Sequence, residues 1–535
     1  MSAPFDNASQ PFGSARFAGP EEASRAGLFT REPHSLLVGF MGNQPLWYSG
    51  LGGVLTIAGP RAGKGRDLLL YNICQGIHAP TMIILDIKGG ELAIVSQNQT
   101  GDRKFNVYWN PRKVGGLPAH RINPLDNINA DNPFVISETK SFIENALPRS
   151  GAAQSVYFEG RAHEMVEGMS LTIVKRDRVL TYPALYETIN LLVRGGDKWL
   201  DFAFEMAESG FDIAERVEDE IADARKDSSG GFKGILGEIT RAFACLSDPV
   251  LLESVSPPFD FSFADLCKSD QTYNVYLMPD ANFVETWGAV IKSMFVAAQV
   301  YKARSPSAPR QTWMLDELGQ LGKFPLALKA FTRDAGTGIR PWGVFQSVKQ
   351  MRALAPDGDT ILPASAALQT WFGIRDEGTA SHLSRMIGNE TLHYADKHAI
   401  ANVHHAKLKM VQTIMRGGNP FHAAFDLAHQ TRLASIPKTV GRPLRTTDEI
   451  LGMPDNKMVV FADGLSNPLW ADRKAYYDQP QMAGRYHPNP FFPPETHVQV
   501  MTKRGPKWRP VITEPVPRQF AHYPQYRDGT WSRIG

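Results

Sequence analysis

"LTIAGPRAGKGRDLLLYN", residues 55–72, passes from an apolar run through a loop with glycines and a lysine into a segment of helical character. A strand, a loop and a helix in this order predict a phosphate-binding loop, because the loop N–H groups and the helix N-terminus can surround a phosphate. The usual pattern is G-x-x-x-x-G-K followed by S or T. Here Gly63 and Lys64 are in place, Ala58 stands first, and Gly65 replaces the hydroxyl that would hold Mg²⁺. The stretch is either a nucleotide site of a particular type or a glycine-rich turn.

The nucleotide interpretation is favoured because the strand and the helix lie where the mechanism requires them. In this interpretation Lys64 reaches the β and γ oxygens of the nucleotide, and the loop backbone binds the phosphates. The predicted nucleotide-binding residues are Ala58, Gly59, Pro60, Arg61, Ala62, Gly63, Lys64, Gly65 and Arg66.

An acidic pair follows a second apolar run, in "QTWMLDELGQLG", residues 311–322. A nucleoside triphosphatase places a metal-binding carboxylate and then a general base at such a strand end, which assigns the metal to Asp316 and the attacking water to Glu317. Alone, the pair could equally be a solvated turn. Together with the loop upstream, it favours the catalytic interpretation.

Two further strand ends carry polar residues. Gln346 follows the run "PWGVFQS", where it either senses the γ-phosphate in the ligand crevice of an open sheet or only precedes a helix. Asp86, Lys88 and Glu91, in "LDIKGGEL", either lie near the nucleotide or cap the next helix. Both questions stay open from the residues alone.

Strand and helix signals alternate along most of the chain, which predicts an α/β fold with a mostly parallel sheet. An apolar pattern at helical spacing interrupts them and predicts an inserted all-α domain. The expected organisation is a segment without fixed structure at 1–35, a nucleotide-binding domain from 36–130 and 256–480, an all-α domain at 131–255, and a Pro-rich, aromatic, basic tail at 481–535 that forms an extended appendage. Trp313, Trp342 and Trp371 fall in strand patterns, which favours core packing over base stacking.

The composition is that of an ordinary globular protein: 535 residues, 43% hydrophobic, with a formal charge of +2. The three cysteines are far apart and predict buried thiols in a reducing compartment rather than a metal or disulfide role. The N-terminus has no signal-peptide pattern, and no apolar window is long enough to span a bilayer.

With these residues in hand, the sequence resembles the TraG/TraD family of type IV secretion coupling proteins over roughly residues 36–480. "IAGPRAGKG" is similar to that family's own phosphate loop, in which Lys is often followed by Gly, so Gly65 is a family-type substitution. The other motifs follow in the family's order: "ILDIKGGEL", "VYWNP", "HRINPLDNI", "YFEGRAHEMVEGM", "MLDELGQLGKF", "GIRPWGVFQSVKQM" and "WFGIRDEGTASHLSRMIGNETL".

The resemblance implies a RecA-like nucleotide-binding domain, ATP and Mg²⁺ as cofactors, and a homo-oligomeric ring, usually a hexamer, with DNA in its central pore. Glu317, Lys64 and Gln346 become the expected catalytic residues and Asp316 the metal ligand. An arginine finger is also expected, for which Arg333, Arg340 and Arg375 are equal candidates.

Two features depart from the family. Its members commonly begin with transmembrane helices, and this sequence shows none, so we expect a cytoplasmic protein attached at the bacterial inner membrane through partners. The basic tail has no family counterpart. Its candidate partners are DNA, a relaxase or another channel component.

The function expected from the sequence is that of a DNA-dependent ATPase, which recruits DNA–protein (relaxosome) or protein substrates and feeds them to the secretion channel in conjugative transfer. One alternative is a nucleotide-gated substrate adaptor without hydrolysis, for which Gly65 leaves room. The other is a related DNA-pumping motor for partitioning or packaging.

Overall fold

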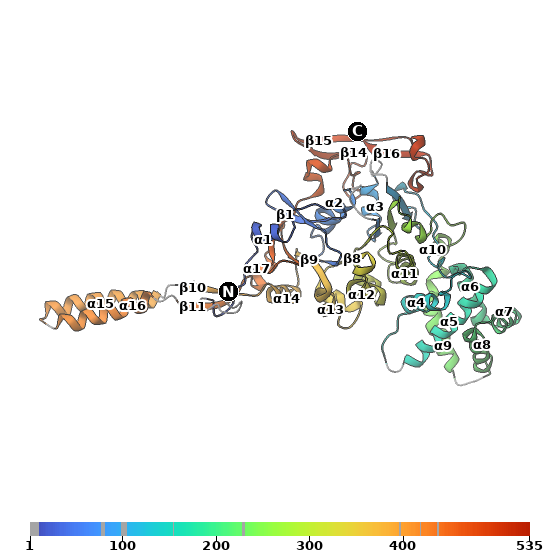
Figure 1. The fold of residues 1–535 in the computed structure, drawn as a ribbon, viewed down its shortest axis with the longest axis horizontal. Helices are drawn as coiled ribbons and strands as arrows, with labels where there is room; N and C mark the ends of the chain where they lie inside the picture. The colour runs from blue at the N-terminus through green and yellow to red at the C-terminus, as the bar shows by residue number, and fades with distance from the viewer. Residues whose placement is uncertain are drawn as a thin grey trace.

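The computed structural model describes residues 10–75, 81–97, 104–152, 155–226, 230–394, 397–417, 419–435 and 438–535. Its centre is an eleven-stranded sheet in the order β2-β1-β13-β12-β9-β3-β8-β7-β4-β6-β5 (Figure 1). Seven neighbouring strands are parallel: β9 (Ala366–Phe372), β3 (Gly53–Ala58), β8 (Ile339–Phe345), β7 (Gln311–Leu315), β4 (Thr81–Leu85), β6 (Thr272–Leu277) and β5 (Lys104–Trp109). Four strands extend the β9 edge in antiparallel pairing: β12 (Lys457–Ala462), β13 (Leu469–Asp472), β1 (Leu36–Met41) and β2 (Gln44–Tyr48).

The central strands are continuous apolar runs because both of their faces are covered. Every residue of β3, β4, β7 and β8 is buried. Trp313, Trp342 and Trp371 are all buried, and each indole N–H donates to a neighbouring Gln or Thr. The prediction that these tryptophans pack in the core is confirmed.

The helices connecting these strands are short, apart from α11. They are α2 (Leu70–Ile73), α3 (Glu91–Ser96), α11 (Gly288–Arg304), α12 (Pro325–Thr332), α13 (Gly358–Ser365), α14 (Glu377–Ile387) and α17 (Thr447–Leu451).

A group of helices separates two strands that are neighbours in the sheet. β5 ends at Trp109 and β6 begins at Thr272, yet they pair in parallel along their whole length. Between them lie α4 (Val135–Ala146), α5 (Val156–Asp177), α6 (Tyr182–Arg194), α7 (Asp197–Ala207), α8 (Asp212–Ala224), α9 (Gly231–Phe243) and α10 (Pro249–Ser254), seen at the lower right of Figure 1. The predicted α/β class with a mostly parallel sheet and a helical region is confirmed, whereas the residue limits of the domains stay predictions.

The described part of the N-terminal segment is ordered, although the sequence predicts no fixed structure before residue 36. α1 (Pro20–Arg25) buries Ala23, and the backbone N–H groups of Ala15 and Ala18 donate to the carbonyls of Asn389 and Pro468. These partners lie more than 370 residues away along the chain. Local composition could not reveal them.

The C-terminal segment folds onto the edge of the sheet, where the sequence predicts an extended appendage. β14 (His497–Thr502), β15 (Gly505–Pro515) and β16 (Thr530–Ile534) form a three-stranded antiparallel sheet. Gln525 accepts from the N–H of Asn106 at 2.9 Å and donates to the carbonyl of Lys104 at 2.8 Å, both in β5. The segment thereby satisfies backbone groups that edge strand β5 would otherwise expose.

A second appendage projects at the left of Figure 1, away from the C-terminal sheet at the top of the picture. The strands β10 (Asn389–Tyr394) and β11 (Lys438–Pro443) pair in antiparallel fashion and carry the helical hairpin of α15 (Lys397–Met415) and α16 (Pro420–Ser435). We call residues 397–435 the arm. The sequence pattern places this stretch in the nucleotide-binding domain and predicts no arm.

Candidate functional site

The loop of residues 59–64 leaves β3 at the middle of the sheet, between β9 and β8. Arg61 and Gly63 have positive φ angles of 58° and 89°, which fold the loop back on itself before the helical turns η1 (Gly65–Leu69) and α2. A Cβ added to Gly59 would lie 2.2 Å from the carbonyl oxygen of Gly373. Only glycine at position 59 therefore allows the loop to pass so close to the end of β9.

Lys64 meets the acidic pair at the end of β7. Its Nζ lies 3.2 Å from Oδ1 of Asp316 and 3.0 Å from Oε1 of Glu317. All three residues are more than 90% buried. The loop and the acidic pair, which lie some 250 residues apart in the sequence, form one cluster as the sequence predicts, because the strands that carry them end at the same edge of the sheet.

Lys88 completes this cluster with a second positive charge. Its Nζ lies 3.2 Å from Oδ2 of Asp316 and 3.6 Å from Oε1 of Glu317. Burial would raise the pKa of Glu317, but the charge and hydrogen bond of Lys64 and the charge of Lys88 outweigh it and lower that pKa. Burial likewise opposes the charged form of Lys88, and Asp316 and Glu317 outweigh it and raise its pKa. Glu317 is therefore held as a carboxylate, the form that a general base needs.

Two glutamines surround the same carboxylate. Gln320, in η7 (Leu318–Leu321), donates to Oε2 of Glu317, and a side-chain hydrogen bond with Gln346 further lowers the pKa of Glu317. Glu317 itself has a φ of 55°, a left-handed conformation that is strained for a residue with a Cβ. The predicted catalytic residues Lys64, Glu317 and Gln346 thus lie together, while their catalytic roles stay predictions.

The other two residues of the "LDIKGGEL" motif lie outside this cluster. Asp86 Oδ2 accepts from the N–H of Ala93 at 2.9 Å, inside α3, and burial raises the pKa of Asp86 to about 7. Glu91 accepts from Asn489 at 2.7 Å. The three residues of the motif therefore differ. Lys88 reaches the Lys64 cluster, Asp86 caps α3, and Glu91 links α3 to the C-terminal segment.

A buried arginine that no sequence motif predicts holds the backbone of the phosphate loop in place. Nη1 of Arg473, just after β13, donates to the carbonyl of Ala62 at 2.5 Å and to Oδ2 of Asp67 at 2.7 Å. Its guanidinium also lies 4.1 Å from the centre of the Phe372 ring. No local motif marks Arg473, because its partners lie about 400 residues upstream.

The three candidate arginine fingers differ in their surroundings. Arg340 is buried and donates to Gly50, His34 and Thr312, so it is fixed within its own chain and unsuited to reach a neighbour. Arg333 pairs with the buried Asp334 at 3.1 Å. Arg375 is exposed in the loop after β9, where its Cγ would lie 3.6 Å from a Cβ at Gly59, so it lies beside the phosphate loop of its own chain.

The donor set fits a nucleotide with Mg²⁺. Oδ1 of Asp316 is buried and lies 3.2 Å from Lys64 Nζ, but it accepts no hydrogen bond among the described residues. This carboxylate oxygen is therefore suited to accept a hydrogen bond from a metal-bound water. Within the described residues no three His, Cys, Asp or Glu gather as a metal cage. Mg²⁺ commonly binds through one or two carboxylates and the substrate phosphates, which one acidic pair beside a phosphate loop can provide.

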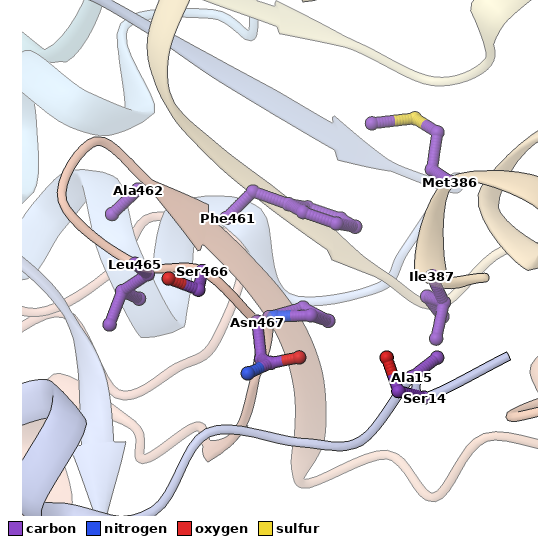
Figure 2. Close-up of a pocket in the computed structure, with 10 residues that line it drawn as sticks. Ser14, Ala15, Met386, Ile387, Phe461, Ala462, Leu465, Ser466 and Asn467 are labelled. Carbon is purple, nitrogen blue, oxygen red and sulfur yellow. The ribbon is translucent and has the colours of Figure 1, made fainter. Parts of the chain in front are cut away.

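A separate cavity of about 280 Å³ lies at the C-terminal end of β12 (Figure 2). Ala462 of β12 pairs with Leu368, at the opposite end of β9 from Phe372, which pairs with Ala58. No charged side chain lines the cavity, whose walls are Ser14, Ala15, Met386, Ile387, Phe461, Ala462, Leu465, Ser466, Asn467 and Pro468. The cavity is not part of the Lys64 cluster.

Known proteins resemble this chain over most of its length. A family model described as "Type IV secretory system Conjugative DNA transfer" matches residues 16–499. A conjugal transfer protein TraG from Escherichia coli is 22% identical over 526 residues, which cover 88% of this chain and 78% of the relative. A second TraG from the same species is 21% identical over 532 residues, covering 88% of this chain and 77% of the relative.

The solved structures show the same fold. The plasmid coupling protein TrwB in complex with a non-hydrolysable GTP analogue has a TM-score of 0.59 at 14% identity, covering 86% of this chain and 96% of that chain. TrwB in complex with ADP and Mg²⁺ has a TM-score of 0.55 at 14% identity, covering 88% of this chain and 96% of that chain. Among the described helices of this chain, none is long and apolar enough to cross a membrane.

Proposed function

Because this chain belongs to the type IV secretory system conjugative DNA transfer family, we propose that it is a coupling ATPase that feeds DNA–protein or protein substrates to a secretion channel. The observation that carries the proposal is the buried cluster of Lys64, Asp316 and Glu317. Both carboxylates lie within 3.2 Å of the Lys64 ammonium. Hydrolysis of a nucleoside triphosphate needs a lysine that binds phosphate, a carboxylate that binds the metal and a general base, and these three residues can supply them.

Each residue has a proposed task. ATP would supply the phosphoryl group, and Mg²⁺ would neutralise charge on its oxygens. Lys64 and the backbone of residues 58–66 would bind the phosphates, and Asp316 would hold Mg²⁺ through water. Glu317 would accept a proton from the attacking water, while Gln346, hydrogen-bonded to Glu317, would respond to the γ-phosphate and pass the change to the substrate path.

The proposal includes partners that the site itself does not contact. These are DNA, a relaxase or effector protein, and channel components at the cytoplasmic face of the bacterial inner membrane. We also propose a homo-oligomeric ring, since ring ATPases complete each nucleotide site with an arginine from the neighbouring subunit. Arg333 remains a candidate for that role, whereas Arg375 lies beside the phosphate loop of its own chain and would act there.

Steady-state ATP hydrolysis, measured with and without single-stranded DNA, tests the proposal. We expect turnover that DNA stimulates. Gly65 favours the second candidate, a nucleotide-gated adaptor, because the loop lacks one direct Mg²⁺ ligand. Nucleotide binding without turnover under every DNA condition would contradict the ATPase and support the adaptor.

Replacing Gly65 with Ser is expected to strengthen the use of Mg²⁺. A Cβ at position 65 would meet no atom within 4 Å, and Gly65 is not among the positive-φ residues, so a side chain fits without strain. The added hydroxyl should lower the Mg²⁺ concentration for half-maximal nucleotide binding, on the order of a few fold for one added oxygen ligand. Titration of Mg²⁺ at fixed nucleotide measures this.

Gly65→Ala is the matched control because it adds the same Cβ without the oxygen. The alanine variant should keep the native Mg²⁺ requirement. If serine and alanine shift the requirement equally, the effect comes from the backbone of the loop, and the assignment of a metal position beside residue 65 is wrong.

A further inference from the structure

The arm carries an apolar surface that no other described part of the chain covers. Val403, Ala406 and Met410 are half-buried within the arm. Five other apolar residues of α15 fall within one sector of roughly 120° at 100° per residue. Each is about half exposed or more: Ile400, Leu408, Val411, Ile414 and Met415.

Helix α16 repeats this arrangement. Phe421 and Phe425 are 81% and 74% exposed and lie one turn apart, with Arg432 further along the same row. Residues 397–435 contain five Lys and Arg residues against one Asp, a formal charge of +4. The arm is therefore apolar and basic on an exposed surface.

A surface of opposite charge and similar apolar character lies on α7. Leu200 and Phe204 are 64% and 62% exposed and form a ridge of residues one turn apart. Asp197 lies three positions before Leu200, Asp201 lies three positions before Phe204, and both aspartates are exposed. Residues 197–224, which include α7 and α8, contain ten Asp and Glu residues against two Lys and Arg, a formal charge of −8.

These two surfaces cannot meet within one chain. Figure 1 is drawn with the longest axis horizontal, and the arm lies at its left end while α7 and α8 lie at its right end. We propose that the arm of one copy docks on the α7 ridge of a second copy, with the apolar faces in contact and Lys407 and Arg432 facing Asp197 and Asp201.

Such a contact joins two different surfaces of identical chains. Head-to-tail contacts of this kind build a closed ring when the rotation between copies closes, and a filament when it does not. The contact supplies the ring of the proposed function with a physical link between neighbours. It depends on no residue of the Lys64 cluster, so it can fail while the ATPase holds, and the reverse.

A nucleic acid is the weaker candidate for the arm. Phosphate binding requires basic groups but gives no reason for seven large apolar side chains exposed on α15 and α16. It would also leave the acidic ridge of α7 unexplained. One protein partner with an apolar and acidic face accounts for both surfaces.

Charge reversal in the full-length chain tests the contact. The arm variant is Lys407→Glu with Arg432→Glu, and the ridge variant is Asp197→Lys with Asp201→Lys. Sedimentation velocity over a concentration series, with and without Mg-ATP, measures self-association. Each variant alone should weaken it on the order of tenfold, because like charges then face each other.

An equimolar mixture of the two variants should restore association, because each chain then offers a surface complementary to the other. Lys503→Glu with Lys507→Glu, exposed in the turn and strand of the C-terminal sheet, is the control and should associate as the native chain does. A native chain that stays monomeric under all these conditions, or a mixture that does not recover, would overturn the proposal. So would an arm variant that loses binding to single-stranded DNA while its self-association is unchanged.

Discussion

Glu317→Gln is expected to lower the turnover number for ATP by roughly 10²–10⁴-fold, the usual contribution of a positioned general base. Glutamine has the shape of glutamate, so its side chain can keep contacts with Lys64, Gln320 and Gln346. It also tolerates the left-handed backbone at position 317 as well as glutamate does. The amide cannot accept the proton of the attacking water, so chemistry is lost while the site keeps its shape.

The kinetic pattern separates this cause from a loss of binding. The turnover number should fall, and the affinity for ATP, measured by direct titration, should stay close to native or rise slightly because one negative charge is gone. An enzyme that retains native turnover with glutamine at 317 would rule this residue out as the base.

Glu91→Gln is the matched control for this experiment. Glu91 also follows a strand end, and from the sequence it is an equal candidate to lie near the nucleotide. In the structure it contacts Asn489 instead. We expect its turnover to stay within about twofold of native, because Glu91 is half-buried against Asn489 and not beside Glu317.

The sequence predicts the reactive residues of this site better than the residues that hold them in place, and the reason is physical. Lys64 and Gly63 belong to a motif whose geometry is local, and Asp316 and Glu317 end a strand that a parallel sheet must place beside the loop. Parallel order brings strand ends to one edge. Which strands are neighbours, however, depends on the whole topology.

Lys88 illustrates this limit. It reaches Asp316 because β4 pairs directly with β7, although 225 residues separate them in sequence. The strand order could not be read from the residues, so Lys88 and Glu91 looked alike. Arg473 illustrates a second limit, because a single buried cation that holds the carbonyl of Ala62 has no periodic or local signature.

The appendages were also beyond local patterns. Proline and aromatic residues after position 481 are typical of extended segments, but Gln525 and Tyr523 find partners on β5, where Tyr523 stacks on Phe105 at 4.4 Å. In the arm, α15 and α16 pack mainly on each other. Their apolar residues predict a helix equally well inside a domain or outside it.

Lys64→Ala is expected to abolish productive nucleotide binding, lowering kcat/KM for ATP on the order of 10³-fold, because the variant loses the cation aimed at the β and γ oxygens. The same change removes a partner of two buried carboxylates. It should also destabilise the folded chain, by less than the roughly 3–5 kcal/mol typical of an unpaired buried charge, because Lys88 remains.

The destabilisation should depend on pH in a definite direction. In the native chain Lys64 is the main cause that lowers the pKa of Glu317 against burial, so removing it raises that pKa. A carboxylate with a raised folded-state pKa takes up a proton more readily in the folded chain, and protonation then stabilises that state. The stability difference between native and variant should therefore be largest near neutral pH and shrink as the pH falls through the range of the Glu317 pKa.

Chemical denaturation at neutral and mildly acidic pH measures this difference in stability. The proteins compared are the native chain, Lys64→Ala and the double variant Lys64→Ala with Glu317→Gln. The double variant lacks the charge that Lys64 compensates, so it should recover part of the lost stability at neutral pH. A double variant that is no more stable than Lys64→Ala at every pH would show that the ammonium does not stabilise Glu317. The pairing of Lys64 with Glu317 would then contribute nothing to the stability of the folded state.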